Sequence, residues 1–279
     1  MQKTLPFPLL LWGIFFVGSI LVGIGCWIFD FFSKRPVQRL HLYPLSIRWY
    51  VVLGSGGMFF AIPWILQKTS GLQWLPAGNP IERIFWFGGV VECLLFLFFL
   101  LLLRVPSICM GFQEEHWLGV SIAQCIRGFL KSLPLVFLVA ALWIPFLMGL
   151  KKIGLPVTIE FQPIMQYLMK GHVGTLSLCV IGFSAIVLGP ICEEIFFRGI
   201  LLRYFCTHLS RAHSVWLSSI IFAIMHRHMT AFLPIVAMGY WLGWLYMKTQ
   251  NLMVEIVVHG MFNAVSFAGA VLFAHFYAN

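Results

Sequence analysis

Charged side chains are scarce in this sequence. Only 10% of its 279 residues are Asp, Glu, Lys or Arg, whereas soluble proteins contain about a quarter. Hydrophobic residues make up 61% of the chain, and the mean hydropathy is +0.93. This balance excludes an ordinary soluble domain. The alternating pattern of a membrane β-barrel is also lacking, so we expect an all-α fold, a polytopic transmembrane helical bundle.

Several enzyme and metal-site motifs are missing as well. The chain has seven cysteines but no CxxC pair, so no zinc ribbon or disulfide framework is expected. It contains no HExxH string, which excludes that class of zinc protease. Asp30 is the only aspartate, which excludes a two-aspartate intramembrane protease. Gly54-Ser55-Gly56 lacks the glycine two positions before the serine that a nucleophile elbow needs.

The net charge of +9 comes from basic residues that flank apolar runs. This placement indicates positive-inside topology and attraction to anionic lipid, and it argues against nucleic acid as a partner. The segment 33–48 carries four Lys or Arg and the segment 68–83 carries two. We therefore expect a cytoplasmic first loop and an outside N-terminus, in a multi-pass protein of the bacterial plasma membrane.

Apolar runs separated by charged or Pro/Gly-containing breaks predict about eight hydrophobic segments. Pro190 is expected to kink or restart the helix that continues over 191–206. The mixed stretch 104–128 suggests an interfacial amphipathic helix, and 153–172 a loop with one surface helix. The eight segments are 5–32, 49–67, 84–103, 129–150, 174–189, 214–228, 232–248 and 252–276.

Two carboxylates and a guanidinium lie together in apolar sequence. An ionised group at membrane depth costs on the order of 2.5–3.5 kcal/mol and is kept mostly where it pairs or works. Glu194 and Arg198 are four positions apart, the helical spacing for facing side chains. Glu193 points about 100° away and lacks that partner, which suits a general base acting on water. Alternatively, both glutamates only clamp Arg198. The neighbouring Cys192 is expected to pack as a small hydrophobe.

Two further apolar helices carry histidines. Phe222 and His226 share a helical face, although a lone histidine there can also be a satisfied core residue. His259 and Asn263 lie one turn apart and can both donate hydrogen bonds to an oxygen. They could stabilise an oxyanion or, with His226, hold a metal or a water. Glu255, one turn before His259, either orients the imidazole or lies at the lipid headgroups; the latter is favoured.

Two more polar residues stand near these motifs. His228 follows Arg227 at the end of a predicted helix, so we expect it at the membrane interface. Glu92 lies in the middle of the third apolar segment, and the sequence assigns it no partner.

The order of these motifs resembles the CPBP family of intramembrane proteases. That family includes type II CAAX prenyl endopeptidases and many bacterial proteins linked to bacteriocin processing and self-immunity. The resemblance covers roughly 174–267. It divides one integral membrane unit into N-terminal transmembrane helices of unassigned role, 1–130, and a CPBP-like core, 131–279. The matching motifs are Glu193-Glu194-x-x-x-Arg198, Phe222-x-x-x-His226 and His259-x-x-x-Asn263.

The resemblance also implies a role for each matched residue. Glu193 is the expected base, with His226 assisting it, while His259 and Asn263 bind the water or the oxyanion. Glu194, Arg198 and Phe222 are supporting residues. The family has been described both as metal-dependent and as metal-free. We favour no obligatory cofactor; the alternative is zinc or another divalent metal bound by Glu193, His226 and His259.

The implied function is intramembrane hydrolysis of a peptide bond. The expected partners are the lipid bilayer and a membrane protein or lipidated peptide, either CAAX-type or bacteriocin-like, and no nucleic acid. Two alternatives stay open. One is a non-catalytic scaffold or immunity protein with the same fold. The other is a small transporter, for which broken helices and membrane acids would be typical but inverted repeats are not seen.

Overall fold

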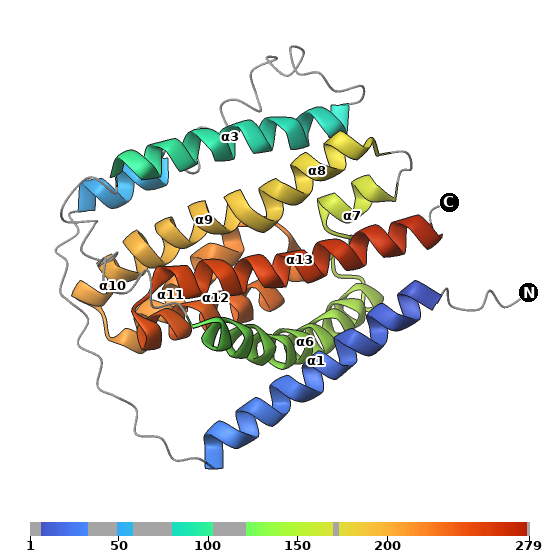
Figure 1. The fold of residues 1–279 in the computed structure, drawn as a ribbon, viewed down its shortest axis with the longest axis horizontal. Coiled ribbons are helices and arrows are strands. Elements are labelled where there is room, and N and C mark those ends of the chain that lie inside the picture. The colour runs from blue at the N-terminus through green and yellow to red at the C-terminus, as the bar shows by residue number, and fades with distance from the viewer. Residues whose placement is uncertain (1–6, 33–48, 58–79, 103–120, 170–172, 278–279) are drawn as a thin grey trace, which may run out of the picture.

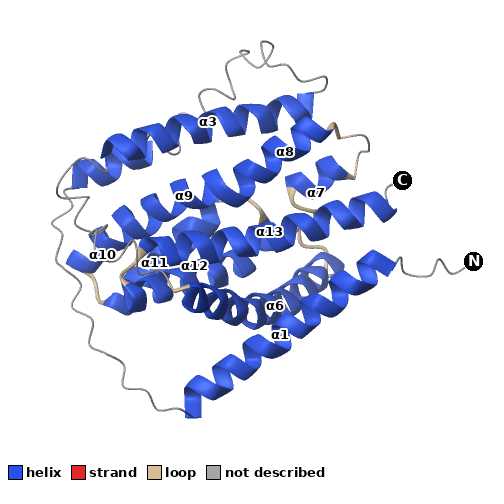
Figure 2. Cartoon of the chain, viewed as in Figure 1, coloured by secondary structure: helices blue, strands red, loops and turns tan. Residues whose placement is uncertain are grey.

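The computed structural model describes residues 7–32, 49–57, 80–102, 121–169 and 173–277. These residues are almost entirely helical and contain no β-strand (Figure 2), so the predicted all-α class is confirmed. In addition to a helical stretch at 49–57, the elements are α1 (Phe7–Phe32), α3 (Pro80–Leu102), α6 (Ile122–Lys152), α7 (Pro163–Leu168), α8 (Thr175–Phe183), the π-helical η2 (Ser184–Leu188), α9 (Gly189–Glu194), the π-helical η3 (Ile195–Leu202), α10 (Arg203–His208), α11 (Arg211–Met225), the 3₁₀ turn η4 (Met229–Ala231), α12 (Phe232–Thr249) and α13 (Leu252–Tyr277).

Five helices in the described part of the chain are long and apolar enough to cross a membrane, which makes this a multi-pass integral membrane protein. The expected count of about eight is not confirmed. Of the three other predicted segments, 84–103 and 214–228 correspond to shorter apolar helices, Phe87–Phe99 and Arg211–Met225, and more than half of 49–67 lies outside the described residues. The segment 174–189 continues through 191–206 as one helix, Thr175–His208. Most of the predicted interfacial helix, 104–128, also lies outside the described residues; its C-terminal end instead belongs to α6.

Helix α13 runs through the middle of the bundle (Figure 1). On one side it packs on the helix formed by α8 to α10, which α3 covers in turn. On the other side it packs on α6, against which α1 lies. The short helices α11 and α12 form a pair that contacts η3 and α6. This arrangement places η2, α9, α11 and α13 around a common centre, where the motif residues lie.

The N-terminal helix α1 is attached to α6 by polar as well as apolar contacts. Asp30 pairs with Arg127, 2.7 Å away, and with the ammonium of Lys131. The indole nitrogen of Trp27 donates a hydrogen bond to the Lys131 carbonyl. The only aspartate of the chain therefore has a structural partner set between helices, consistent with its exclusion from a catalytic role.

Gly23 is the closest point of approach between α1 and α6. A Cβ atom at this glycine would lie 2.0 Å from the backbone oxygen of Leu130, so Gly23→Ala must push the helices apart. We expect it to destabilise the protein by about 1–3 kcal/mol, the usual cost of overpacking. Thermal unfolding in detergent measures this. Gly25→Ala is the matched control, because no atom lies within 4 Å of its Cβ position; equal stabilities of the two variants would contradict the packing.

Candidate active site

The helix that carries the glutamates passes through Pro190 by means of a π-helical turn. Proline has no backbone N–H and would break an ordinary helical hydrogen-bond ladder. Here the Gly189 N–H donates to the Ser184 carbonyl, five residues earlier, which widens the helix in η2. The predicted kink or restart is thus replaced by a π turn, a feature frequent at functional sites. Glu193 and Glu194 lie at the end of α9, the helical segment that follows this π turn.

Widening the helix leaves carbonyls of η2 to be satisfied from outside. The Ala185 carbonyl cannot bond to residue 190, which lacks an N–H, and instead accepts a hydrogen bond of 2.8 Å from the Asn263 amide. The Ile186 carbonyl lies so near α13 that a Cβ at Gly260 would stand 2.7 Å from it. Asn263 and Gly260 therefore dock α13 against the turn that precedes the glutamates.

Glu194 and Arg198 form the ion pair that their spacing predicts. The Arg198 Nη1 and Glu194 Oε1 atoms are 2.8 Å apart, and both side chains are almost fully buried. Arg198 also donates to the Gly239 carbonyl of α12, and its guanidinium lies 4.7 Å from the centre of the Phe222 ring. These contacts join α9, α11 and α12, so the pair organises the centre of the bundle.

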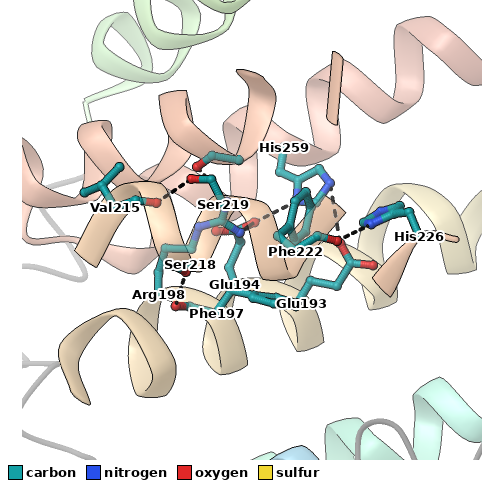
Figure 3. A network of polar contacts seen from close by, with 11 residues as sticks. Glu193, Glu194, Phe197, Arg198, Val215, Ser218, Ser219, Phe222, His226 and His259 are labelled. Carbon is teal, nitrogen blue, oxygen red and sulfur yellow. Dashed lines mark hydrogen bonds and ion pairs between the residues drawn. The ribbon is translucent and has the colours of Figure 1, made fainter. Parts of the chain in front are cut away.

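His259 connects the two glutamates. Its Nδ1 atom lies 2.8 Å from Glu194 Oε1, and since a carboxylate only accepts, Nδ1 carries the donated hydrogen. Its Nε2 atom faces Glu193, 3.7 Å from Oε2. The His259 side chain is buried, whereas a quarter of the Glu193 side chain is exposed. Glu193 is thus the more exposed of the two carboxylates, and Glu194 is the one that holds the imidazole (Figure 3).

His226 stands at the open side of the same group. It caps the C-terminal end of α11, and its Nδ1 atom donates a 2.8 Å hydrogen bond to the Phe222 carbonyl. The side chain is exposed, so it is not a satisfied core histidine. Its ring packs 4.6 Å from the Phe222 ring, centre to centre. Figure 3 places Glu193, His226 and His259 around Phe222, on three different helices.

One sequence-based expectation is corrected here. Glu255 does not project to the lipid headgroups: it is fully buried and accepts a hydrogen bond of 2.8 Å from Thr249. This contact occupies Oε1, and the carboxylate that contacts His259 Nδ1 is that of Glu194. The interfacial position expected for His228 stays a prediction; its Nδ1 atom accepts a hydrogen bond from the Ala231 amide and caps the turn η4.

The donor types at the site suit a divalent metal, but their positions do not. Each histidine has an acceptor on Nδ1 that fixes its ring, as metal ligands usually do. However, the described His, Cys, Asp and Glu side chains form no group of three or more placed to hold a metal ion. Glu193, His226 and His259 do not meet as three ligands around one point. The chemistry below is therefore derived from the side chains alone.

Comparisons with known proteins bear on the same part of the chain. Residues 175–265 match the family model described as Type II CAAX prenyl endopeptidase Rce1-like. Residues 175–265, named the Rce1-like domain for this similarity, make up less than half of the chain. This domain contains every motif residue of the site and agrees with the resemblance to the CPBP family.

One curated relative is similar over a short part of the chain. A protein of Bacillus subtilis (strain 168), named "Putative membrane peptidase YdiL", is 35% identical over 77 residues. That alignment covers 28% of this chain and 32% of the relative, so the chain matches about a third of that protein's length. No solved structure matches significantly. Residues 175–265 are thus similar to a family described by a membrane endopeptidase activity, while α1 and α3 lie outside the matched residues.

Proposed function

We propose that this protein is an intramembrane endopeptidase in which Glu193 activates the attacking water. The observation that carries the proposal is the partly exposed Glu193 carboxylate opposite His259 Nε2, at 3.7 Å, within an Rce1-like domain. A carboxylate that has access to water and is backed by a fixed imidazole has the composition that general-base hydrolysis needs.

The proposed reaction has two steps. Glu193 takes a proton from water as the water oxygen attacks the carbonyl carbon of the peptide bond, which gives a tetrahedral oxyanion. Glu193 then returns the proton to the amide nitrogen as the C–N bond breaks, and His226 assists from the open side. The products are a carboxylic acid and an amine, so all atoms of the peptide and the water are accounted for.

His259 and Asn263 are the proposed stabilisers of the oxyanion. Both ring nitrogens of His259 face carboxylates, and both donate only when the imidazole is protonated. In that form Nε2–H is a donor directed to the reaction centre. One N–H of the Asn263 amide bonds to Ala185, and the second N–H of that amide is the proposed oxyanion donor. Preorganised donors of this kind are worth roughly 10²–10³ in rate.

The proposed substrate is a membrane-associated polypeptide, either lipidated near its C-terminus or bacteriocin-like. The test is cleavage by the purified protein in lipid nanodiscs, with farnesylated CAAX peptides, their unmodified counterparts and bacteriocin precursors as substrates. Fragments identified by mass spectrometry support the proposal. In cells, a scaffold or immunity protein of the same fold would still function when it carries the Glu193→Gln substitution. A protease that carries this substitution would not.

We predict that activity does not depend on a bound metal. Purified active protein should contain far less than stoichiometric zinc by elemental analysis, and chelation followed by dialysis should leave the cleavage rate unchanged. The reason is the position of Glu193, His226 and His259, which do not form a three-ligand group. Stoichiometric zinc that is lost in a His226→Ala/His259→Ala variant, and that restores activity to apo-protein, would contradict this prediction.

A further inference from the structure

Glu92 is an acid within an apolar helix that the mechanism above does not use. It lies in the middle of α3, outside the Rce1-like domain. Helix α3 packs along α8, η2 and α9 (Figure 1), and Glu92 is half-buried against them. A carboxylate at such a position is costly and is expected to have a function or a dedicated partner.

Within the described part of the chain, the polar contacts of Glu92 fall on the π turn and the glutamate helix. The hydroxyl of Ser184, the first residue of η2, donates a hydrogen bond to Glu92 Oε2. Its other carboxylate oxygen, Oε1, lies 3.6 Å from the place where a Cβ at Gly189 would stand. The Cys192 thiol lies 3.6 Å from the Glu92 carbonyl oxygen. Glu92 therefore binds the first residue of η2, lies close to Gly189 at the start of α9, and contacts the residue just before Glu193.

Opposite α3, the same turn is docked on α13. There Asn263 binds the Ala185 carbonyl and Gly260 makes room for the Ile186 carbonyl. Because Pro190 has no N–H, the Ala185 carbonyl of this π turn has no donor within its own helix and depends on Asn263. The turn is thus held between two helices, and Glu193 follows it by five residues. A shift of η2 would move the carboxylate of Glu193 relative to His259.

We propose that Glu92 is a positioning residue for the active site: through Ser184 it fixes η2 and thereby the placement of Glu193. The inference rests on the proposed function, since the position of Glu193 matters for catalysis only if Glu193 is the base. It also gives the N-terminal part of the chain a role, because the Rce1-like domain alone lacks this contact.

The first test is kinetic. Glu92→Ala and Ser184→Ala should each lower kcat by roughly 10–100-fold, the scale of a misplaced reactive group, with KM unchanged. The double variant should be no slower than Glu92→Ala, because both substitutions remove the same hydrogen bond. Glu92→Gln keeps an acceptor for Ser184 and should restore most of the rate. Cys93→Ala, at an exposed neighbouring position on α3, is the control and should behave like the wild type.

The second test does not need a substrate. Hydrogen–deuterium exchange of the backbone amides in 184–194 should be faster in Glu92→Ala and Ser184→Ala than in wild type and Cys93→Ala. If the wild type cleaves no peptide, the proposed function fails, and the exchange rates still decide whether Glu92 fixes the turn. Exchange at the wild-type rate in Glu92→Ala overturns the inference. So does unchanged kcat, or a Glu92→Gln variant as slow as Glu92→Ala, where a substrate is cleaved.

Discussion

Replacing Glu193 or His226 by alanine is expected to lower the rate of peptide cleavage by roughly 10²–10⁴-fold each, the usual contribution of one acid–base group. Glu193 is the partly exposed carboxylate opposite His259, and His226 is an exposed histidine that packs on Phe222. Neither side chain takes part in the buried ion pair between Glu194 and Arg198, so both variants should fold. The measurement is the initial rate in nanodiscs at matched protein concentration.

A matched control for this prediction is Glu160→Ala. This variant also removes a carboxylate, but the Glu160 side chain is exposed in the loop before α7. Its rate should equal that of the wild type. Full cleavage by either Glu193→Ala or His226→Ala would show that the assigned mechanism is wrong, even if the protein is a protease.

Glu194→Ala is expected to act through stability, with a loss of about 3–5 kcal/mol in the free energy of unfolding. The substitution leaves the guanidinium of Arg198 buried without its carboxylate and removes the acceptor of His259 Nδ1. Denaturant or thermal unfolding in detergent, together with the yield of folded protein, measures the effect. Replacing Arg198 by methionine in the same variant should recover part of the loss, because it removes the unpaired charge.

The neighbouring glutamate provides the control for this second prediction. Glu193→Ala deletes the same carboxylate one residue earlier, and its unfolding should match that of the wild type. If Glu193→Ala unfolds the protein while Glu194→Ala only slows cleavage, the two roles are reversed.

The local features of the site follow from the sequence. The Glu194–Arg198 pair and the shared face of Phe222 and His226 depend only on the spacing of a single helix, so both are confirmed. The all-α membrane fold follows from composition in the same way. Such features need no knowledge of how the helices are arranged.

Contacts between helices were beyond the sequence argument. Along its own helix, His259 has only Glu255 as a possible orienting acid, an alternative that was not favoured, whereas Glu194 reaches His259 from α9. Glu255 itself is expected at the headgroups because polar residues surround it, but tertiary packing buries it. Glu92 likewise appeared to have no partner because Ser184 lies 92 residues away. These pairs depend on which helices become neighbours, and no periodicity encodes that.

The path of the glutamate helix was mispredicted for a related reason. Pro190 normally ends or kinks a helix, so two segments were expected where one continuous helix lies. The helix continues because Asn263 donates a hydrogen bond to the Ala185 carbonyl. Asn263 lies far away in the sequence, on α13. Two residues of the sequence mark this packing. Ser184 donates a hydrogen bond to Glu92, and Gly260 allows α13 to approach the Ile186 carbonyl closely.

The most direct test of the central claim compares the wild type with Glu193→Gln on one lipidated peptide, with fragments quantified by mass spectrometry. Glutamine keeps the shape of the side chain but does not act as a base. The account predicts two complementary fragments from the wild type and none above background from Glu193→Gln, at equal expression and equal thermal stability. Cleavage by Glu193→Gln at the wild-type rate would contradict it.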